Sequence, residues 1–364
     1  MKILLVTNIV SHHQLPLARE LCKLIGVEDF LFAATEDVSQ ERIRNGWQDC
    51  YSESWIIHPN NSIEEKEKYE RFWNEADAVL CGERLIDRMQ KRVNNNKLCF
   101  YMSERWWKPP IGILRLCHPK FLTMFLKFRQ LSQSKHFHYL PTGPFAKKDL
   151  ARLVPMPGRV WDWGYFTEMS SSVRKKGEVD FVSVLWVGRM LKWKNLDLLI
   201  KVLAKLKGEG KKFKLTLVGE GPERIRLENI ADELLGEHYF TIHDFIPSSK
   251  VTKLMSEHDI YVLPSNSYEG WGAVVNEAMS VGCAVIASDK TGAGASMIEH
   301  GINGLLFQSG SKKSLYKELE KLICSKGLVN ILGCNARQSV INKWQPSEIA
   351  KYFVLLAISL NSSS

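Results

Sequence analysis

Short apolar segments alternate with helix-like segments along most of this 364-residue chain, and this alternation limits its possible folds. In the first half the strand-like segments are almost continuously apolar: Lys2–Thr7, Phe30–Ala34, Ala78–Cys81 and Leu98–Tyr101. Such strands need cover on both faces, which is the pattern of parallel sheets enclosed by helices. Helical spacing lies between them, at Gln14–Leu24, Ile63–Ala76 and Glu83–Val93. The sequence therefore predicts an α/β fold built on a doubly wound sheet.

The second half repeats this alternation more regularly. Its predicted strands are Val182–Val187, Phe213–Val218, Tyr239–Ile242, Asp259–Leu263 and Cys283–Ala287. Helices of roughly 10 to 15 residues between such strands are typical of a second doubly wound domain. After the turn dipeptide Asn303-Gly304 we expect helix to the end, with a last helix near Ser347–Ile358.

A domain boundary is predicted between the halves, where Pro155–Phe166 is rich in Pro, Gly and aromatic residues and Thr167–Glu178 is polar. Linkers of this composition are crossed by few contacts. The predicted domains are therefore residues 1–167 and 168–345, followed by a terminal helix and tail at 346–364. The tetrapeptide GWQD at 46–49 is assigned no role.

Composition narrows the class of protein. No run of about 18 to 20 apolar residues is present, and the start MKILLVTNIV continues into SHHQ as a first strand would, so we expect neither a membrane span nor a signal peptide. The eight cysteines are scattered without metal-site spacing, which favours free thiols in a reducing cytosol and no metal site. The net charge of +9 admits an anionic ligand, membrane or nucleic acid, but no nucleic-acid module is visible.

The stretch Tyr261–Met279, YVLPSNSYEGWGAVVNEAM, predicts a strand, a short polar loop and a helix that begins near Gly272. Backbone amides at such a helix start bind anions, phosphate above all. Glu269 precedes these amides and Glu277 follows about one turn into the helix. Carboxylates are poor phosphate ligands but suit sugar hydroxyls, so the stretch predicts a site for a nucleotide-sugar diphosphate.

Three further motifs occur in order before it or beside it: Gly188-Arg189 with Lys194, LVGEGPE at Leu217–Glu223, and GCAVIAS after Met279. Together with Glu269–Met279 these resemble the C-terminal domain of retaining, family-4-like glycosyltransferases (glycosyl transferases group 1). The resemblance covers about Val182–Phe307. It implies a GT-B fold: two facing Rossmann-like domains with the donor site in the cleft and a C-terminal helix that crosses back to the N-terminal domain.

The resemblance also implies residue roles. Arg189 and Lys194 would hold the diphosphate and stabilise leaving-group charge without an obligatory metal, which their positive charges allow. Glu277 would bind the ribose and Glu269 the donor sugar. The remaining donor-binding positions are two glycines that permit close backbone approach, two residues near the base and the helix-start segment: Gly219, Gly221, Phe245, Ile246, Gly270, Trp271, Gly272, Ala273 and Val274.

The acceptor side is defined less closely. The family's glycine pair after the first strand is replaced by Ser11-His12-His13, and its Pro-Glu near Gly292 reads Ala295-Ser296. We rank His13, then Glu104, then His12 as the group that acts on the acceptor hydroxyl, because all three follow predicted strand ends.

The resemblance predicts a cytoplasmic, metal-independent hexosyltransferase that moves a sugar from a UDP or GDP sugar to a glycan or lipid-linked acceptor with retention, in polysaccharide or lipopolysaccharide biosynthesis. Residues Trp106–Gln130 combine aromatic, aliphatic and basic side chains, which suits an anionic membrane surface or equally a helix packed on its own domain. Two alternatives stay open: a nucleotide-sugar 2-epimerase of the same architecture, and a non-catalytic basic protein that binds membrane or nucleic acid.

Overall fold

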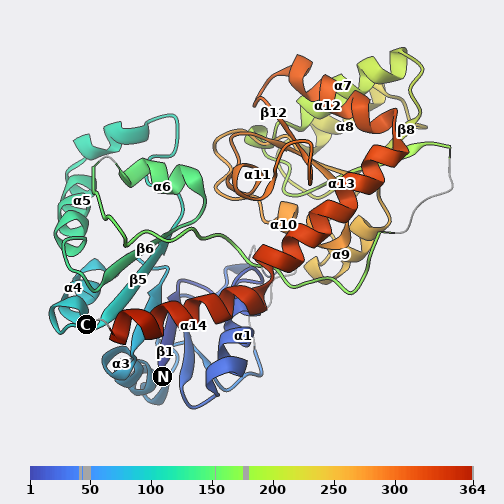
Figure 1. Ribbon diagram of the computed structural model, residues 1–364. Helices are drawn as coiled ribbons and strands as arrows, with labels where there is room; N and C mark the ends of the chain where they lie inside the picture. The colour runs from blue at the N-terminus through green and yellow to red at the C-terminus, as the bar shows by residue number, and fades with distance from the viewer. Residues whose placement is uncertain (41–42, 44–50, 152, 175–179, 363–364) are drawn as a thin grey trace. The chain divides into compact units, whose positions relative to one another are not determined.

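A computed structural model describes residues 1–40, 43, 51–151, 153–174 and 180–362. It divides into two units: residues 1–167 with 346–364, and residues 168–345 (Figure 1). The tetrapeptide at 46–49 lies outside the described residues.

The N-terminal unit contains one parallel sheet of six strands in the order β3-β2-β1-β4-β5-β6. Its strands are β1 (Ile3–Thr7), β2 (Phe30–Ala34), β3 (Ile56–Ile57), β4 (Ala78–Cys81), β5 (Leu98–Ser103) and β6 (Phe137–Pro141). Its helices are α1 (Leu15–Ile25), α3 (Ile63–Glu75), α4 (Ile86–Asn94), η1 (Gly112–Cys117), α5 (Pro119–Leu131) and α6 (Pro144–Ala151). The strand order reverses direction between β1 and β4, which creates a crevice at the carboxyl ends of these strands.

The C-terminal unit has a second parallel sheet, in the order β12-β11-β10-β7-β8-β9. Its strands are β7 (Val182–Val187), β8 (Phe213–Val218), β9 (Phe240–His243), β10 (Ile260–Leu263), β11 (Ala284–Ser288) and β12 (Leu305–Phe307). Its helices are η2 (Lys192–Lys194), α7 (Leu196–Gly208), α8 (Arg224–Leu234), α9 (Ser248–Ser256), α10 (Val274–Val281), α11 (Gly292–Met297), α12 (Lys312–Ile323), α13 (Lys326–Ser339) and η3 (Val340–Trp344). Here the order reverses between β7 and β10.

The last helix, α14 (Pro346–Ser362), belongs to the N-terminal unit. It packs along α1 and against β5, and the ring of its Phe353 lies 4.9 Å from that of Phe100 (Figure 1). The predicted return of the C-terminal helix is therefore confirmed.

Two predictions about secondary structure were wrong. Residues 305–307 form the edge strand β12 in a region expected to be helical, and the helix expected from Glu83 begins at Ile86. The basic amphipathic stretch 106–130 consists of two buried tryptophans, Trp106 and Trp107, followed by η1 and by α5. A two-residue strand, β3, was not predicted at all.

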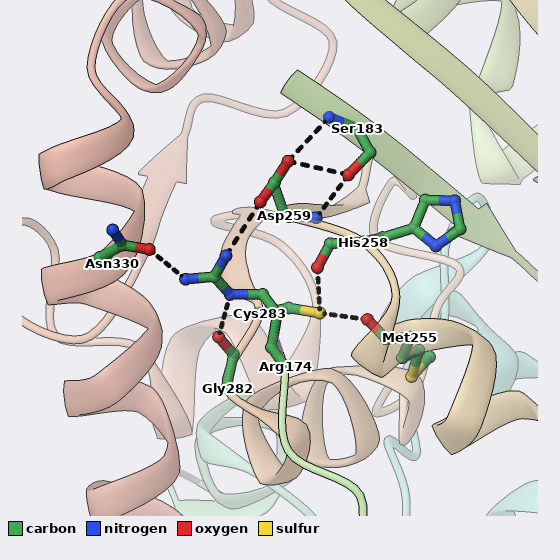
Figure 2. Close-up of polar contacts among 8 residues, drawn as sticks. All are labelled: Arg174, Ser183, Met255, His258, Asp259, Gly282, Cys283 and Asn330. Carbon is green, nitrogen blue, oxygen red and sulfur yellow. Dashed lines mark hydrogen bonds and ion pairs between the residues drawn. The ribbon is translucent and has the colours of Figure 1, made fainter. Parts of the chain in front are cut away.

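The segment that follows the domain boundary is fixed to the C-terminal unit by Arg174 (Figure 2). Its guanidinium donates to Asp259 Oδ1 at 2.9 Å, to the Gly282 carbonyl at 3.1 Å and to Asn330. Asp259 Oδ2 in turn accepts from the backbone and hydroxyl of Ser183, at 3.0 and 2.9 Å. The network joins the starts of β7 and β10 (Figure 2). It therefore lies at the amino-terminal ends of these strands, whereas the predicted site lies at their carboxyl ends.

Candidate active site

The predicted donor loops both leave the sheet at its reversal point. The loop after β7 carries Arg189 and Lys194, and the loop after β10 carries Glu269. In open α/β sheets ligands bind outside the carboxyl ends of the strands at this point. The strand order thus brings together two motifs that lie about 75 residues apart in the sequence.

The two loops are joined by polar contacts. Lys194 Nζ forms an ion pair with Glu269, and both side chains are largely buried, at 16% and 14% exposure. The Asn266 amide donates to the Trp193 carbonyl at 2.9 Å, and the Asn195 side chain reaches the Pro264 carbonyl at 3.3 Å. Arg189, by contrast, is exposed. The ion pair therefore places one positive and one negative side chain at the carboxyl ends of β7 and β10.

The structure explains why positions 219 and 221 are glycine. A Cβ at Gly219 would collide with the carbonyl of Gly188, and one at Gly221 would collide with the backbone of Met190. Both glycines also have positive φ, 138° and 151°, where side chains are strained. Because neither glycine has a side chain, the loop after β8 packs directly on the Gly188–Met190 loop. This contact fixes the backbone that carries Arg189.

The helix α10 begins at Val274 after Ala273 as N-cap, with no side-chain cap. The amides of a helix's first turn have no intrahelical acceptor and point out of the helix start. Gly272, with φ of 92°, turns the chain into this helix, and a Cβ there would meet Leu263 at 2.7 Å. Gly270 also lies close to the turn before α11, since a Cβ on Gly292 would meet its carbonyl at 2.5 Å. Close packing thus fixes the backbone of residues 270–274, the segment for which an anion site was predicted.

Glu277 lies in the first turn of α10 and is 9% exposed. Burial raises the pKa of its carboxyl from the usual 4.5 to about 7. A buried carboxyl costs free energy when it ionises, and among the residues that the structure describes no lysine or arginine forms an ion pair with Glu277, which makes it a candidate for ligand binding.

The Trp271 side chain packs inside the C-terminal unit, at 1% exposure. Its indole nitrogen donates to Asn276 Oδ1 at 2.8 Å and its ring lies 5.6 Å from that of Trp344. The Trp271 ring, predicted as part of the donor site, therefore packs in the interior of the unit.

The two residues predicted near the base lie in the irregular loop after β9. Phe245 is 39% exposed and Ile246 is half-buried. Arg224, at the start of α8, ties this loop to the preceding one: its guanidinium pairs with Asp244 at 2.8 Å and donates to the Gly219 carbonyl at 3.0 Å.

In the N-terminal unit, a cavity of about 170 Å³ opens at the carboxyl ends of β1, β4, β5 and β6. It is lined by His13 and Glu104, two of the three residues predicted for the acceptor side, together with Thr7, Asn8, Thr142 and Tyr165. The structure thus brings His13 and Glu104, which are 91 residues apart in the sequence, to one pocket.

Glu104 is held at both carboxylate oxygens. Tyr165 donates its hydroxyl to Oε1 at 3.0 Å, and Lys108 Nζ lies 2.6 Å from Oε2. Burial, together with the charge of Glu104, raises the pKa of Tyr165 well above its usual range, so the phenol stays protonated and donates. These two contacts fix the orientation of the Glu104 carboxylate in the pocket and leave a further lone pair on each oxygen.

The two histidines adjoin each other just before α1, with ring centroids 3.8 Å apart. Burial lowers the pKa of His12 to about 4, and burial plus the neighbouring His12 lower that of His13 well below 6.5. Both rings are therefore neutral at pH 7 and able to accept a proton. His13 also stacks on Tyr165, with centroids 5.6 Å apart, whereas His12 is not among the residues that line the cavity.

Lys108 and Tyr165 were not predicted as site residues. Tyr165 lies in the segment WDWGYF, which was read as a boundary, and it is 61 residues from Glu104 in sequence. Lys108 stands four residues after Glu104, which was a usable signal for an ion pair.

Comparison with known families gives a match in the second half of the chain. Residues 170–339 match the model of one family, glycosyl transferases group 1. This segment covers nearly the whole C-terminal unit, including Arg189, Lys194, Glu269 and Glu277.

Curated relatives match part of the chain. An uncharacterized glycosyltransferase of Methanocaldococcus jannaschii is 29% identical over 168 residues, 46% of this chain and 42% of the relative. The amylovoran biosynthesis glycosyltransferase AmsK of Erwinia amylovora is 32% identical over 145 residues, 38% of this chain and 35% of the relative. The capsular polysaccharide biosynthesis glycosyltransferase CapM of Staphylococcus aureus is 28% identical over 166 residues, which are 44% of this chain and 41% of the relative. The chain spans about two fifths of the length of the curated relatives it matches.

Solved structures resemble the whole chain. HepE of Anabaena, in complex with UDP, has a TM-score of 0.74 at 16% identity and covers 99% of this chain and 100% of its own. Sucrose-phosphate synthase of Thermosynechococcus elongatus has a TM-score of 0.73 at 17% identity, with full coverage of both chains. These likenesses confirm the predicted GT-B fold.

Proposed function

We propose that this chain transfers a sugar from a nucleotide-diphosphate sugar to a glycan or lipid-linked acceptor, with retention of the anomeric configuration and without a metal. The observation that carries the proposal is the Lys194–Glu269 ion pair at the sheet reversal, beside the start of α10. Lys194 and Arg189 would bind the diphosphate, Glu269 the sugar and Glu277 the ribose. Charge that develops on the leaving diphosphate would be stabilised by fixed cations and helix-start amides.

The donor is proposed to be a UDP or GDP sugar. HepE has been solved with UDP and with UDP-glucose, which supports UDP as the first choice. The Asp244–Ile246 loop, held by Arg224, would contact the base through Phe245 and Ile246. The names of AmsK and CapM support a role in polysaccharide biosynthesis.

The pocket of the N-terminal unit is proposed to take the acceptor. His13 would accept the hydroxyl proton late in transfer, since burial keeps its ring neutral, and Glu104 would orient the acceptor through the hydrogen bonds that already fix its own position. His12 does not line this pocket and is therefore the last of the three candidates for this role.

A nucleotide-sugar panel tests the proposal. We expect one UDP or GDP sugar to raise the melting temperature of the full chain, and the same donor to be consumed with added acceptor, in the presence of a chelator, to give a product with the donor's anomeric configuration by NMR. Release of epimerised sugar that needs no acceptor would favour the epimerase. No response to any nucleotide sugar would remove the transferase.

A further inference from the structure

The segment between Glu104 and Asp149 has an unusual charge pattern. It contains no aspartate or glutamate and nine basic residues: Arg105, Lys108, Arg115, Lys120, Lys127, Arg129, Lys135, Lys147 and Lys148. This number equals the net charge of +9 of the whole chain. The chain's positive excess can therefore be assigned to one stretch of the N-terminal unit.

The same segment exposes aliphatic side chains. Ile111 and Ile113 beside η1 are 52% and 50% exposed, Leu114 is 66% exposed, and Leu122 and Leu126 on α5 are 43% and 53% exposed. α5 lies at the edge of the N-terminal unit beside α4 and η1 (Figure 1). We name these five residues, with Lys120 and Arg129, the η1–α5 surface.

The helix α5 has two distinct faces. Phe125, Phe128 and Leu131 are buried in the core, whereas Leu122, Leu126 and Arg129 recur at helical spacing on the exposed side. The aromatic rings of this region, including Trp106 and Trp107, are likewise in the core. The outer side of the surface is therefore aliphatic and basic but not aromatic.

We propose that the η1–α5 surface docks on an anionic lipid bilayer. Exposed aliphatic side chains can enter the boundary between headgroups and acyl chains, while lysine and arginine beside them contact anionic headgroups. A nucleic acid would be held by stacking on exposed aromatic rings, and here those rings face inward. Among the described residues no helix is long and apolar enough to span a bilayer, so this contact is made from the surface.

The chain segment that carries this surface begins at the pocket proposed for the acceptor. Lys108, which binds Glu104, and the Trp107 amide, which donates to Asp149 at 3.0 Å, form the start of the same segment. A lipid-linked acceptor held in the bilayer would therefore reach Glu104 from the docked face. This last step rests on the proposed function, whereas the docking itself does not.

Co-sedimentation of the full chain with vesicles tests the proposal without any nucleotide sugar. We expect the protein to sediment with vesicles of mixed phosphatidylcholine and phosphatidylglycerol at low salt, and to remain in the supernatant with phosphatidylcholine alone. Because each basic residue near an anionic surface strengthens binding by about fivefold, Lys120→Gln with Arg129→Gln weakens it by about 25-fold. Leu122→Ser with Leu126→Ser weakens binding as well, and that loss persists when salt has screened the charges.

Matched control variants distinguish the effect of this surface from the effect of removing charge or apolar side chains elsewhere on the protein. Lys312→Gln with Lys313→Gln removes the same charge from exposed positions of α12, and Ile225→Ser with Ile331→Ser removes exposed isoleucines of the C-terminal unit. Lys127 is left unchanged because it pairs with Asp87 of α4 at 2.8 Å. Equal losses in the controls, no sedimentation of the wild type, or binding to an oligonucleotide in place of vesicles would overturn the proposal. Donor binding is measured without vesicles, so a failure of the proposed function can be distinguished from a failure of membrane docking.

Discussion

Replacing the buried carboxyl of Glu277 should stabilise the protein and remove donor binding at the same time. Burial raises the pKa of this group from 4.5 to about 7, so the folded state binds its proton more tightly than the unfolded state does. Stability therefore falls as pH rises from about 4.5 to about 7, and the full penalty is present above pH 7. A shift of about 2.5 units at ~1.4 kcal/mol per unit gives a penalty of about 3 kcal/mol.

Glu277→Gln has no charge to bury and so escapes this penalty. We expect its stability relative to wild type to improve by about 2 kcal/mol between pH 5.5 and pH 8, because most of the penalty develops in that interval. Urea unfolding followed by far-ultraviolet circular dichroism at both pH values measures the difference. Glu318→Gln is the control: Glu318 is also buried on a helix of the same unit, but it pairs with Lys321 at 2.7 Å and its loss should bring no gain.

A variant no more stable than wild type at pH 8, or a gain of the same size at pH 5.5, would refute this reasoning. The same variant should lose nucleotide-sugar binding, since the glutamine cannot supply the carboxylate that the ribose hydroxyls need. A stabilising change that removes function is what a residue kept for binding is expected to show.

Three further outcomes follow from other parts of the structure. Gly219→Ala should lower the melting temperature and donor affinity together, because its Cβ would strike the Gly188 carbonyl; unchanged melting would contradict the packing. Arg174→Leu should destabilise the protein by about 3 to 5 kcal/mol in urea unfolding, because it leaves Asp259 without its buried cation. The acid side of the kcat/KM profile for transfer should show one limb near pH 7 from the Glu277 carboxyl and a second below pH 6.5 from His13, since burial raises the pKa of the first group and lowers that of the second; a limb near neutrality that vanishes in His13→Gln would argue against this environment.

Much of the fold could be predicted because buried parallel strands are continuous apolar runs. Ile3–Thr7 and Ile260–Leu263 are of this kind, and both strands lie inside their sheets and are buried along their whole length. Leu305–Phe307 was assigned to a helix and Ile56–Ile57 was not predicted. Both are short strands at the edges of the two sheets, and a few apolar residues resemble a turn of helix.

The site was predicted unevenly for a similar reason. Lys194 and Glu269 lie in motifs whose local spacing carries information, and the strand order then brings them together. The contact of Tyr165 with Glu104 depends on tertiary packing across 61 residues, and nothing local in the sequence signals it. The buried packing of Trp271 likewise depends on Trp344, far along the chain.

Titration calorimetry with UDP and GDP tests the central claim most directly, that the loops after β7 and β10 form a nucleotide-diphosphate site. The account predicts saturable binding of one of the two nucleotides to the wild type. It also predicts a loss of about tenfold or more in Lys194→Ala, since a hydrogen bond to a charged group contributes about 1.5 to 3 kcal/mol. Lys192→Ala, at an exposed position two residues earlier, should bind as the wild type does. Failure of both nucleotides to bind, or equal affinity in Lys194→Ala and wild type, would contradict the account.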